Sequence, residues 1–253
     1  MKRVAVITGA TSGMGAEFVR QMIRYMPNID EFWLIARRKD VLISIAERYP
    51  TKGFRLFPMD LENEESWEKY EEVLEKEQPA ISTLVNAAGY GIIGETVEID
   101  VKNQTGMIRL NCEALEAITQ ASIPYMKYGS KIINVGSASA FLPQPGFNVY
   151  AASKAFVLNY SRALGRELRK EGIKVTCVCP GPVETEFFDR AEAIHKSPAY
   201  KKAFRAKKED VVVRALMDAK HGKSLSICKT SMKLMHIAAK ILPNEWILKL
   251  LYR

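Results

Sequence analysis

The sequence predicts a single α/β domain built on a doubly wound parallel sheet of about seven strands, with helices on both faces. Short runs rich in Val, Ile and Leu alternate with longer segments of helical periodicity along the chain. Most of these runs are continuously apolar, as expected of strands whose two faces are both covered. The 253 residues show no linker, internal repeat or low-complexity tract. Strand–helix–strand units with right-handed crossovers therefore fit residues 1–253 as one domain.

The expected elements follow one another in a regular order. Asn63–Glu77 places Trp67, Tyr70 and Leu74 three to four residues apart among acidic side chains, which is typical of a helix with one buried face. The other expected helices are Met14–Tyr25, Val41–Tyr49, 98–127 and 148–171. The expected strands are Arg3–Ile7, Glu31–Ala36, Gly53–Pro58, Ile81–Asn86, Lys131–Val135, Ile173–Val178 and Ser224–Cys228.

The composition excludes several classes of protein. With 47% hydrophobic and 26% charged residues, the chain is neither collagen-like, nor a disulfide scaffold, nor disordered. The only long charge-free run, 132–153, holds polar residues and two prolines, so it is not expected to span a membrane. The apolar stretch 4–7 is too short for a signal peptide. We expect a cytoplasmic protein.

The cysteines and histidines do not indicate a metal site. Four cysteines and three histidines are spread along the chain without a C-x-x-C motif or a Cys/His cluster, so no metal is expected. Cys177 and Cys179 lie two residues apart, on the same side of an expected strand. Buried free thiols in a reducing compartment are the simplest interpretation.

The positive charge is concentrated near the C-terminus. Residues 201–253 hold 13 Lys and Arg against 4 Asp and Glu, whereas residues 1–200 carry a net charge of −1. No nucleic-acid-binding motif or interleaving of aromatic residues accompanies this charge, so nucleic acid is not an expected partner.

A glycine-rich loop follows the first expected strand. Gly9, Gly13 and Gly15 form the pattern G-x-x-x-G-x-G, and a helical segment comes next. Glycines allow a tight turn and close approach to a diphosphate, and the helix N-terminus offers free N–H groups to the anion. This position between a first strand and a first helix predicts a Rossmann-like dinucleotide site.

The end of the second strand indicates which dinucleotide binds. Ala36 stands where an acidic residue would bind the ribose 2′-hydroxyl of NAD, and Arg37 and Arg38 follow it. Arginine favours a 2′-phosphate, although both residues also fit as solvated charges at a helix entry. We expect NADP(H) rather than NAD(H).

Three residues form a candidate reaction centre. Tyr150 and Lys154 lie at positions i and i+4 of an expected helix and therefore share one face. A neighbouring ammonium stabilises a phenolate, so we expect Lys154 to lower the pKa of Tyr150 and allow proton exchange. Ser137 follows the strand Lys131–Val135 and reaches the sheet edge at which ligands bind.

Together these motifs resemble those of the short-chain dehydrogenases/reductases, from Arg3 to about Thr185 and in the family's order. The resemblance implies a catalytic tetrad of Asn111, Ser137, Tyr150 and Lys154. It also implies that Asp60 and Leu61 contact the adenine, and that 180–185 (P-G-x-x-x-T) flanks the nicotinamide. The implied cofactor-binding residues are Gly9, Thr11, Ser12, Gly13, Met14, Gly15, Arg37, Arg38, Asp60, Leu61, Asn86, Ala87, Ala88, Gly89, Tyr150, Lys154, Pro180, Gly181, Val183 and Thr185.

The chain departs from the family pattern at two positions. Ala87 replaces the second Asn of N-N-A-G, which ties neighbouring strands in the family, so we expect a small structural adjustment there. Ser12 stands where some NADP-preferring members carry a basic residue, so the preference for NADP rests on Arg37 and Arg38. Ser139 is a second candidate hydroxyl, but the spacing of thirteen residues to Tyr150 favours Ser137.

The resemblance also implies a mechanism. Ser137 would bind the substrate oxygen, and Tyr150 would protonate it as a hydride arrives from the nicotinamide. Lys154 would hold the ribose hydroxyls, and Asn111 would link Lys154 to solvent through a water molecule. The implied activity interconverts a ketone and a secondary alcohol.

Two C-terminal segments surround the expected site. A lid of about residues 186–208 carries many apolar side chains, which form either a pocket wall for an apolar substrate or the buried side of ordinary helices. We expect a lipid-like, steroid-like or ketoacyl substrate. The lid side chains are Phe187, Phe188, Ala191, Ile194, Ala199, Tyr200 and Phe204; Phe141, Leu142 and Phe147 add apolar character nearby.

The second segment is an amphipathic tail, residues 230–253. Lys233, His236 and Lys240 form one narrow stripe of an expected helix over Thr230–Leu242, and Trp246 lies in the apolar stretch that follows. The wide apolar face must be covered by the domain itself, a second copy in a homodimer or homotetramer, an anionic membrane surface or an acidic carrier protein. Two alternative functions remain: a non-catalytic dinucleotide sensor, and a membrane- or carrier-docked 3-ketoacyl reductase.

Overall fold

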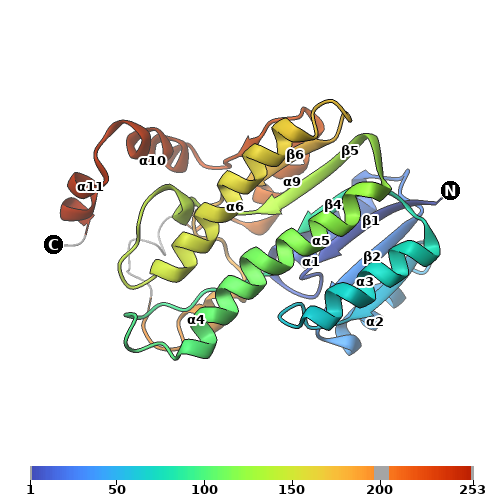
Figure 1. Cartoon of the computed structure of the whole chain (residues 1–253), viewed down its shortest axis with the longest axis horizontal. Coiled ribbons are helices and arrows are strands. Elements are labelled where there is room, and N and C mark those ends of the chain that lie inside the picture. Colours follow the sequence, from blue (N-terminus) through green and yellow to red (C-terminus); the bar gives the residue numbers. More distant parts are fainter. Residues whose placement is uncertain (1, 197–204, 252–253) are drawn as a thin grey trace.

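A computed structural model describes residues 2–196 and 205–251 of the chain. Within these residues, seven parallel strands form one sheet in the order β3-β2-β1-β4-β5-β6-β7 (Figure 1). This arrangement confirms the predicted doubly wound sheet. The strands are β1 (Arg3–Thr8), β2 (Glu31–Ala36), β3 (Gly53–Pro58), β4 (Ala80–Asn86), β5 (Met126–Val135), β6 (Lys174–Val178) and β7 (Leu225–Ser226).

Helices cover both faces of the sheet, as predicted (Figure 1). Alternate residues of β1 enter two separate cores: Ala5 and Ile7 pack with α1, α2 and α9, whereas Val4 and Val6 pack with α3, α5 and α6. Each face of a strand thus meets its own helical layer, which explains why the strands are apolar throughout. These helices are α1 (Gly13–Tyr25), α2 (Lys39–Arg48), α3 (Glu64–Glu77), α5 (Ala114–Ser122), α6 (Asn148–Glu167) and α9 (Lys208–Lys220).

The helix expected over 98–127 is interrupted. It consists of α4 (Val101–Ile108), a π turn (Arg109–Glu113), α5 and a short 3₁₀ turn (Ile123–Tyr125). The buried Asn111 lies in the π turn, where its side-chain amide bonds to Tyr90 and Ser153. A π turn holds one residue more than an α-helical turn, and such turns recur at functional sites.

Three further elements differ from the expectation. β5 begins five residues earlier than Lys131, because Met126 already pairs with Ile81 before an irregularity in the ladder. β7 is reduced to two residues. The sequence analysis assigned no helix to 208–220, yet α9 buries Val211, Val212 and Ala215 against the sheet. This helix lies between the expected lid, which ends at about residue 208, and the expected strand Ser224–Cys228.

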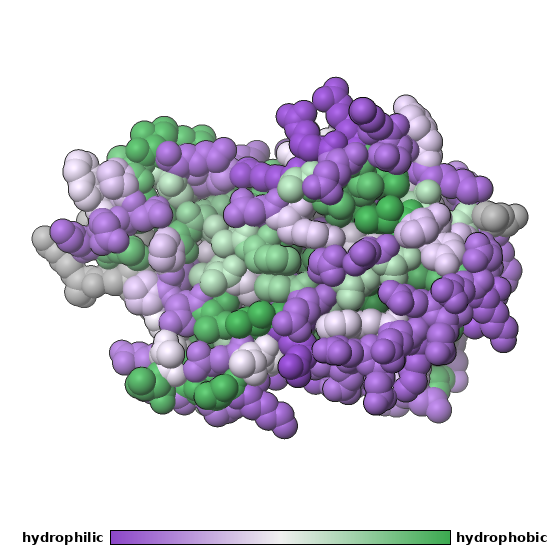
Figure 2. Space-filling view, in the orientation of Figure 1, coloured by the Kyte–Doolittle hydropathy of each residue, from purple (hydrophilic) through white to green (hydrophobic). Residues whose placement is uncertain are grey.

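The tail forms two helices that extend from one end of the sheet (Figure 1). Helix α10 (Thr230–Ile241) buries none of its residues fully, and α11 (Asn244–Leu251) follows it. One side of α10 packs on the domain, because the His236 ring lies 4.3 Å from that of Phe141. The opposite side leaves Leu234 and Ile241 62% and 74% exposed, and Figure 2 shows hydrophobic atoms gathered over α10.

The described residues contain no helix that is both long and apolar enough to cross a membrane. Buried thiols lie where the sequence analysis expects them. Cys177 and Cys179 are fully buried, their sulfur atoms are 3.6 Å apart on one side of β6, and all four cysteines are free thiols.

Candidate active site

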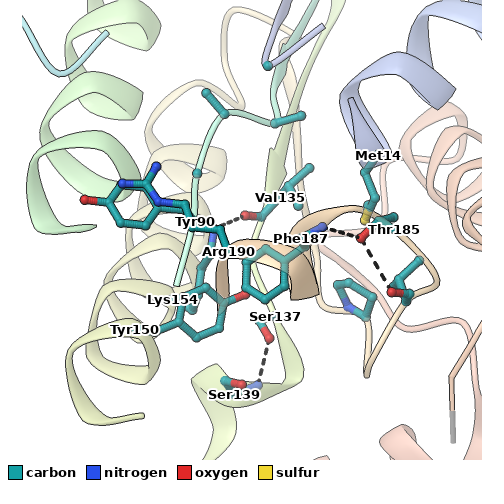
Figure 3. A pocket seen from close by; sticks show the side chains of 18 of the residues that line it. Met14, Tyr90, Val135, Ser137, Ser139, Tyr150, Lys154, Thr185, Phe187 and Arg190 are labelled. Atoms are coloured by element: carbon teal, nitrogen blue, oxygen red, sulfur yellow. Dashed lines mark hydrogen bonds between the residues drawn. The ribbon is translucent and has the colours of Figure 1, made fainter. Parts of the chain in front are cut away.

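One cavity of about 590 Å³ lies at the carboxyl ends of β1, β4, β5 and β6. The sheet end, with the glycine loop and the N-terminus of α6, forms the first wall. The second wall consists of α7 (Phe187–Ala191), α10 and α11, which contribute Met232, Met235, Ile247 and Leu248. Figure 3 shows the side chains that converge on this space. The inner side of the tail thus covers the cavity. Of the four possible covers considered for its apolar face, the domain itself covers this side.

The glycine loop has the shape of a phosphate cradle. Gly9 and Gly13 have φ angles of +66° and +51°, a region in which residues with a Cβ are strained. A Cβ on Gly9 would lie 2.8 Å from the backbone nitrogen of Ala88, and one on Gly15 would collide with the carbonyl of Gly9. Only glycine fits these contacts, so the N-terminus of α1 stays accessible. The residues present therefore fit a nicotinamide dinucleotide, with its diphosphate at this helix end.

The two arginines after β2 have different surroundings. Arg38 donates hydrogen bonds to the carbonyl of Thr11 (2.8 Å) and to the Thr11 hydroxyl (3.4 Å), so it fixes the glycine loop. The Arg37 guanidinium lies 3.9 Å from the carboxylate of Asp60, and its side chain is 58% exposed. Both arginines line the cavity. Arg37 is the cation with the looser attachment and the freer N–H groups.

The strand carrying Asn86 is held from both sides. The Asn86 amide donates to Thr119 (2.8 Å) and Asn134 (2.9 Å), and therefore ties β4 to α5 and β5. The backbone N–H groups of Ala87 and Ala88 both donate to the Thr8 hydroxyl on β1, at 3.0 and 3.1 Å. Thr8 thus ties β4 to β1 at Ala87, which lacks the side-chain amide of the asparagine in the family pattern.

The three residues of the candidate reaction centre lie together in the structure. Tyr150 and Lys154 stand one turn apart on α6, and Ser137 follows β5 and caps a 3₁₀ turn, its hydroxyl accepting from the Ser139 N–H at 3.1 Å. All three residues line the cavity, and none is more than 9% exposed. The Tyr150 ring stacks on Phe147 with 4.3 Å between centroids. Figure 3 shows the three side chains at the same end of the cavity.

The protonation of this centre is governed by burial. Burial raises the pKa of Tyr150 to about 12, and a hydrogen bond with Ser137 opposes the rise. Burial also lowers the pKa of Lys154, to about 8. The sequence analysis predicts a lowered pKa for Tyr150, and the structure gives the opposite direction. The reason is burial, which disfavours the phenolate. The Lys154 ammonium, whose hydrogen bond goes to the Val135 carbonyl at 2.8 Å, lies 5.7 Å from the Tyr150 ring centroid and does not reverse this rise.

Asn111 supports the centre without lining the cavity. Its amide nitrogen donates to the Tyr90 carbonyl (3.0 Å) and the Ser153 hydroxyl (2.9 Å), and its oxygen accepts from the Tyr90 N–H (3.1 Å). No hydrogen bond joins Asn111 to Lys154 among the residues that the structure describes. A Cβ on Gly89 would nevertheless come within 2.6 Å of the Asn111 oxygen and 3.4 Å of the Lys154 ammonium. Both groups therefore lie close to Gly89, and a side chain at this position would collide with the Asn111 oxygen.

Most of the predicted site residues are brought together. Gly15, Asn86 and Asn111 do not line the cavity. Gly15 packs on the Gly9 carbonyl, and the other two hydrogen-bond to Asn134 and Tyr90, so they support the residues that line it. The predicted residues that line it are Gly9, Thr11, Ser12, Gly13, Met14, Arg37, Arg38, Asp60, Leu61, Ala87, Ala88, Gly89, Ser137, Tyr150, Lys154, Pro180, Gly181, Val183 and Thr185.

The lid contributes both apolar and charged side chains to the cavity wall. Phe187 and Phe188 line the space, and the Phe187 ring lies 5.5 Å from that of Tyr150. Ile194 is exposed, whereas Ala191 is buried. The expectations for Ala199, Tyr200 and Phe204 concern residues outside the described ranges.

Sequence reasoning missed two charged groups on this lid. The Glu186 carboxylate accepts a hydrogen bond of 3.0 Å from the N–H of Gly13, at the N-terminus of α1. The Arg190 guanidinium lies over the ring of Tyr90, 3.3 Å from its centroid. Spacing within the lid gave no sign of either contact, because both partners are distant in sequence.

The fold and the site define an oxidoreductase that binds a nicotinamide dinucleotide. A family model described as short chain dehydrogenase matches residues 3–195. Sulfoacetaldehyde reductase 2 of Chromohalobacter salexigens is 32% identical over 195 residues, which is 74% of this chain and 75% of that protein. The chain belongs to the short-chain dehydrogenase/reductase family.

Solved structures show the same fold. A short-chain dehydrogenase from Sphingobium yanoikuyae, in complex with NADPH, is 26% identical with a TM-score of 0.81, covering 99% of this chain and 96% of that one. A family member from Burkholderia phymatum, in complex with NAD, is 20% identical with a TM-score of 0.78, covering 95% of each chain. Both NADPH and NAD therefore occur among these proteins.

Proposed function

We propose that the protein is an NADP(H)-dependent oxidoreductase that interconverts a ketone and a secondary alcohol. The observation that carries the proposal is the meeting of Ser137, Tyr150 and Lys154 in one cavity with the glycine loop. The dinucleotide, when bound, supplies or takes up the hydride. The protein's own share is to bind the substrate oxygen and to deliver or remove one proton.

Tyr150 is the proposed general acid in the direction of reduction. With a pKa raised to about 12, the phenol is protonated at neutral pH and has a proton to give. Ser137, beside it, holds the carbonyl oxygen. Lys154 is the proposed source of positive charge, which offsets the effect of burial when the phenolate forms, and it also holds the cofactor ribose. Asn111 positions Tyr90 and the backbone next to Lys154.

The preference for NADP(H) rests on Arg37 and Arg38, and the absence of an acidic residue at Ala36 supports it. The relative named sulfoacetaldehyde reductase, and a structural neighbour solved with NADPH, are compatible with NADPH-dependent carbonyl reduction. The apolar side chains of both walls support a substrate with lipid-like, steroid-like or ketoacyl parts. Four free thiols fit a reducing compartment, and we place the enzyme in the cytoplasm.

We further infer that the exposed side of α10 and α11 is a contact surface. A second copy of the chain, in a homodimer or homotetramer, or a membrane surface would cover Leu234, Ile241 and Trp246, which are exposed. A carrier-docked 3-ketoacyl reductase is the alternative enzyme. An acidic carrier protein would use the same basic tail.

The test combines cofactor titration with turnover. NADPH is expected to bind more tightly than NADH, and Arg37→Ala is expected to weaken NADPH about tenfold while changing NADH less than about twofold. Nicotinamide fluorescence reports both affinities. Tyr150→Phe is expected to abolish reduction of a panel of apolar ketones and to leave NADPH affinity within about twofold, because the phenol hydroxyl serves the proton transfer. Near-normal turnover by this variant contradicts the assignment, and NADPH binding without any turnover by the parent protein supports a sensor.

A further inference from the structure

Arg190 is a cation on the cavity wall that the proposed mechanism does not use. It lies on α7, its side chain is half-buried, and it lines the same cavity as Ser137, Tyr150 and Lys154. Figure 3 shows it laid against Tyr90 near these residues. A guanidinium carries five N–H donors and no acceptor, so the N–H groups that face the cavity favour an oxygen-bearing ligand.

The other cations on the cavity wall already have an oxygen partner. Arg37 lies near the Asp60 carboxylate, Arg38 donates to Thr11, and Lys154 donates to the Val135 carbonyl. Among the residues that the structure describes, no carboxylate lies within 4.0 Å of the Arg190 guanidinium, and its contact is with the face of an aromatic ring.

The stack on Tyr90 fixes the guanidinium and leaves its edge available. Arg190 lies flat enough for its central carbon to approach within 3.3 Å of the ring centroid. Stacking of this kind engages the face of the guanidinium, whereas the N–H groups lie in its plane and radiate from the edge. Tyr90 is itself held through both backbone groups by Asn111 and by its hydroxyl, which donates to the Asn103 carbonyl at 3.2 Å. The charge is therefore held at a defined place.

This place belongs to the reaction end of the cavity. Phe187, on the same helix as Arg190, has its ring centroid 5.5 Å from that of Tyr150. Tyr90 directly follows Gly89, where a Cβ would lie 3.4 Å from the Lys154 ammonium. The phosphate cradle, by contrast, is contacted by Glu186, one turn before Arg190 on the lid. An oxyanion held by Arg190 would thus lie beside the reacting carbonyl and not at the N-terminus of α1.

We propose that Arg190 is the specificity-determining residue of an anion subsite, and that the substrate is a carbonyl compound with an acidic group: a carboxylate, sulfonate or phosphate. This inference rests on the proposed function and names the substrate class of the same site. The apolar wall formed by Phe187 and Phe147 takes the carbon skeleton, and the in-plane N–H groups of Arg190 take the acid in a bidentate pair.

The test compares matched substrates and three variants. Keto acids with the carboxylate two to six carbons from the carbonyl are measured against their methyl esters with NADPH. Arg190→Leu is expected to lower kcat/KM for the preferred acid about tenfold to hundredfold and for its ester less than about twofold. Arg190→Lys is expected to recover part of the loss. Arg205→Leu is the control, because Arg205 also stacks on a lid ring, that of Phe188 at 4.3 Å, but pairs with Glu192 and does not line the cavity.

Each other outcome has a distinct meaning. Equal losses for acid and ester, or no loss for either, overturn the anion subsite. A loss confined to NADPH affinity shows that the anion is the cofactor diphosphate, which also overturns it. Calorimetric titration with hexanoate and hexanamide gives a readout independent of turnover: hexanoate should bind more tightly to the parent protein, and Arg190→Leu should remove the difference. If no ketone is reduced but this difference is present, the proposed function fails and the anion subsite stands.

Discussion

One wall of the cavity is the carboxyl end of the sheet, and the other is made by α7, α10 and α11. Ser137, Tyr150 and Lys154 on the sheet side are all buried, whereas α10 buries none of its residues fully. Figure 2 shows the same contrast from outside, with apolar atoms exposed over α10 and mostly hydrophilic ones over α3. The proposed proton chemistry needs fixed distances, and its residues lie on this buried wall. In the proposed function, substrate recognition uses the other wall, whose helix α10 is less buried.

The largest expected effect concerns the buried charge of the sheet wall. Lys154 has a pKa of about 8, below its ordinary 10.5, because burial disfavours the ammonium. Burial of the charge costs about 3 kcal/mol below pH 8, and the bond to Val135 returns about 1–2 kcal/mol. Lys154→Met is therefore expected to abolish turnover and yet raise the free energy of unfolding at pH 7 by about 1–2 kcal/mol.

The pH dependence gives the sign of this effect independently. Between about pH 8 and 10.5 the unfolded state binds more protons at Lys154 than the folded state, so stability of the parent protein should rise with pH there. Denaturant unfolding at pH 7, 8, 9 and 10 measures both proteins. The gain of Lys154→Met should shrink across this window and reverse by about pH 10, where the neutral lysine no longer carries the burial cost and keeps its bond to Val135. A variant that is less stable at every pH would show that the sheet wall does not tolerate an uncharged side chain there.

The sheet wall could be predicted from the sequence better than the wall made by α7, α10 and α11. The spacing of Tyr150 and Lys154 needs only one helical turn, and Ser137 needs only the end of one strand, so local periodicity was enough. The break in the helix at Asn111 depends on Tyr90 and Ser153, which are remote in sequence. Local spacing is silent about such partners.

The second wall was predicted less well for the same reason. Arg190 stacks on Tyr90, and Glu186 accepts a hydrogen bond from Gly13. Helix α10 reaches the cavity through Met232, which lies beside Gly181. These contacts depend on how the segments fold back over the sheet. The amphipathic pattern of the tail indicated that an apolar face must be covered, but not that the cover is the substrate cavity.

An intermediate effect is expected where the two walls meet. The Glu186 carboxylate, whose pKa is lowered mainly by its own backbone N–H and also by the Gly13 N–H, is charged at neutral pH and occupies a donor of the phosphate cradle. We therefore expect it to compete with the diphosphate of a bound cofactor. Glu186→Gln is expected to tighten NADPH binding about threefold to tenfold, measured by fluorescence titration.

The control for that variant is Glu184→Gln, because Glu184 is exposed and its backbone bonds to Ala206 instead of the cradle. It should leave NADPH affinity unchanged. Weaker binding by Glu186→Gln would mean that Glu186 helps to hold the cofactor, and would contradict competition between its carboxylate and the diphosphate.

The smallest effect is expected on the outside of the tail. Leu234→Ser with Ile241→Ser should change the free energy of unfolding by less than about 0.5 kcal/mol, since both side chains are exposed. Ile227→Ala, at a buried position, should cost about 2–5 kcal/mol in the same urea titration. A large loss in the double variant would place these side chains in an interface between copies, which sedimentation velocity would detect as a drop in mass.

The π turn at Arg109–Glu113 separates two tasks that usually compete within one helix. In an α-helix each residue advances the side-chain direction by about 100°, so the deletion of one residue rotates everything beyond it by that angle. If one residue of the π turn were deleted and α5 kept Ala114 and Ile118 in the core, the rotation would fall on the residues before α5 and would turn Asn111 away from Tyr90. The extra residue of the π turn thus lets Asn111 point inward to Tyr90 while α5 beyond it keeps Ala114 and Ile118 in the core.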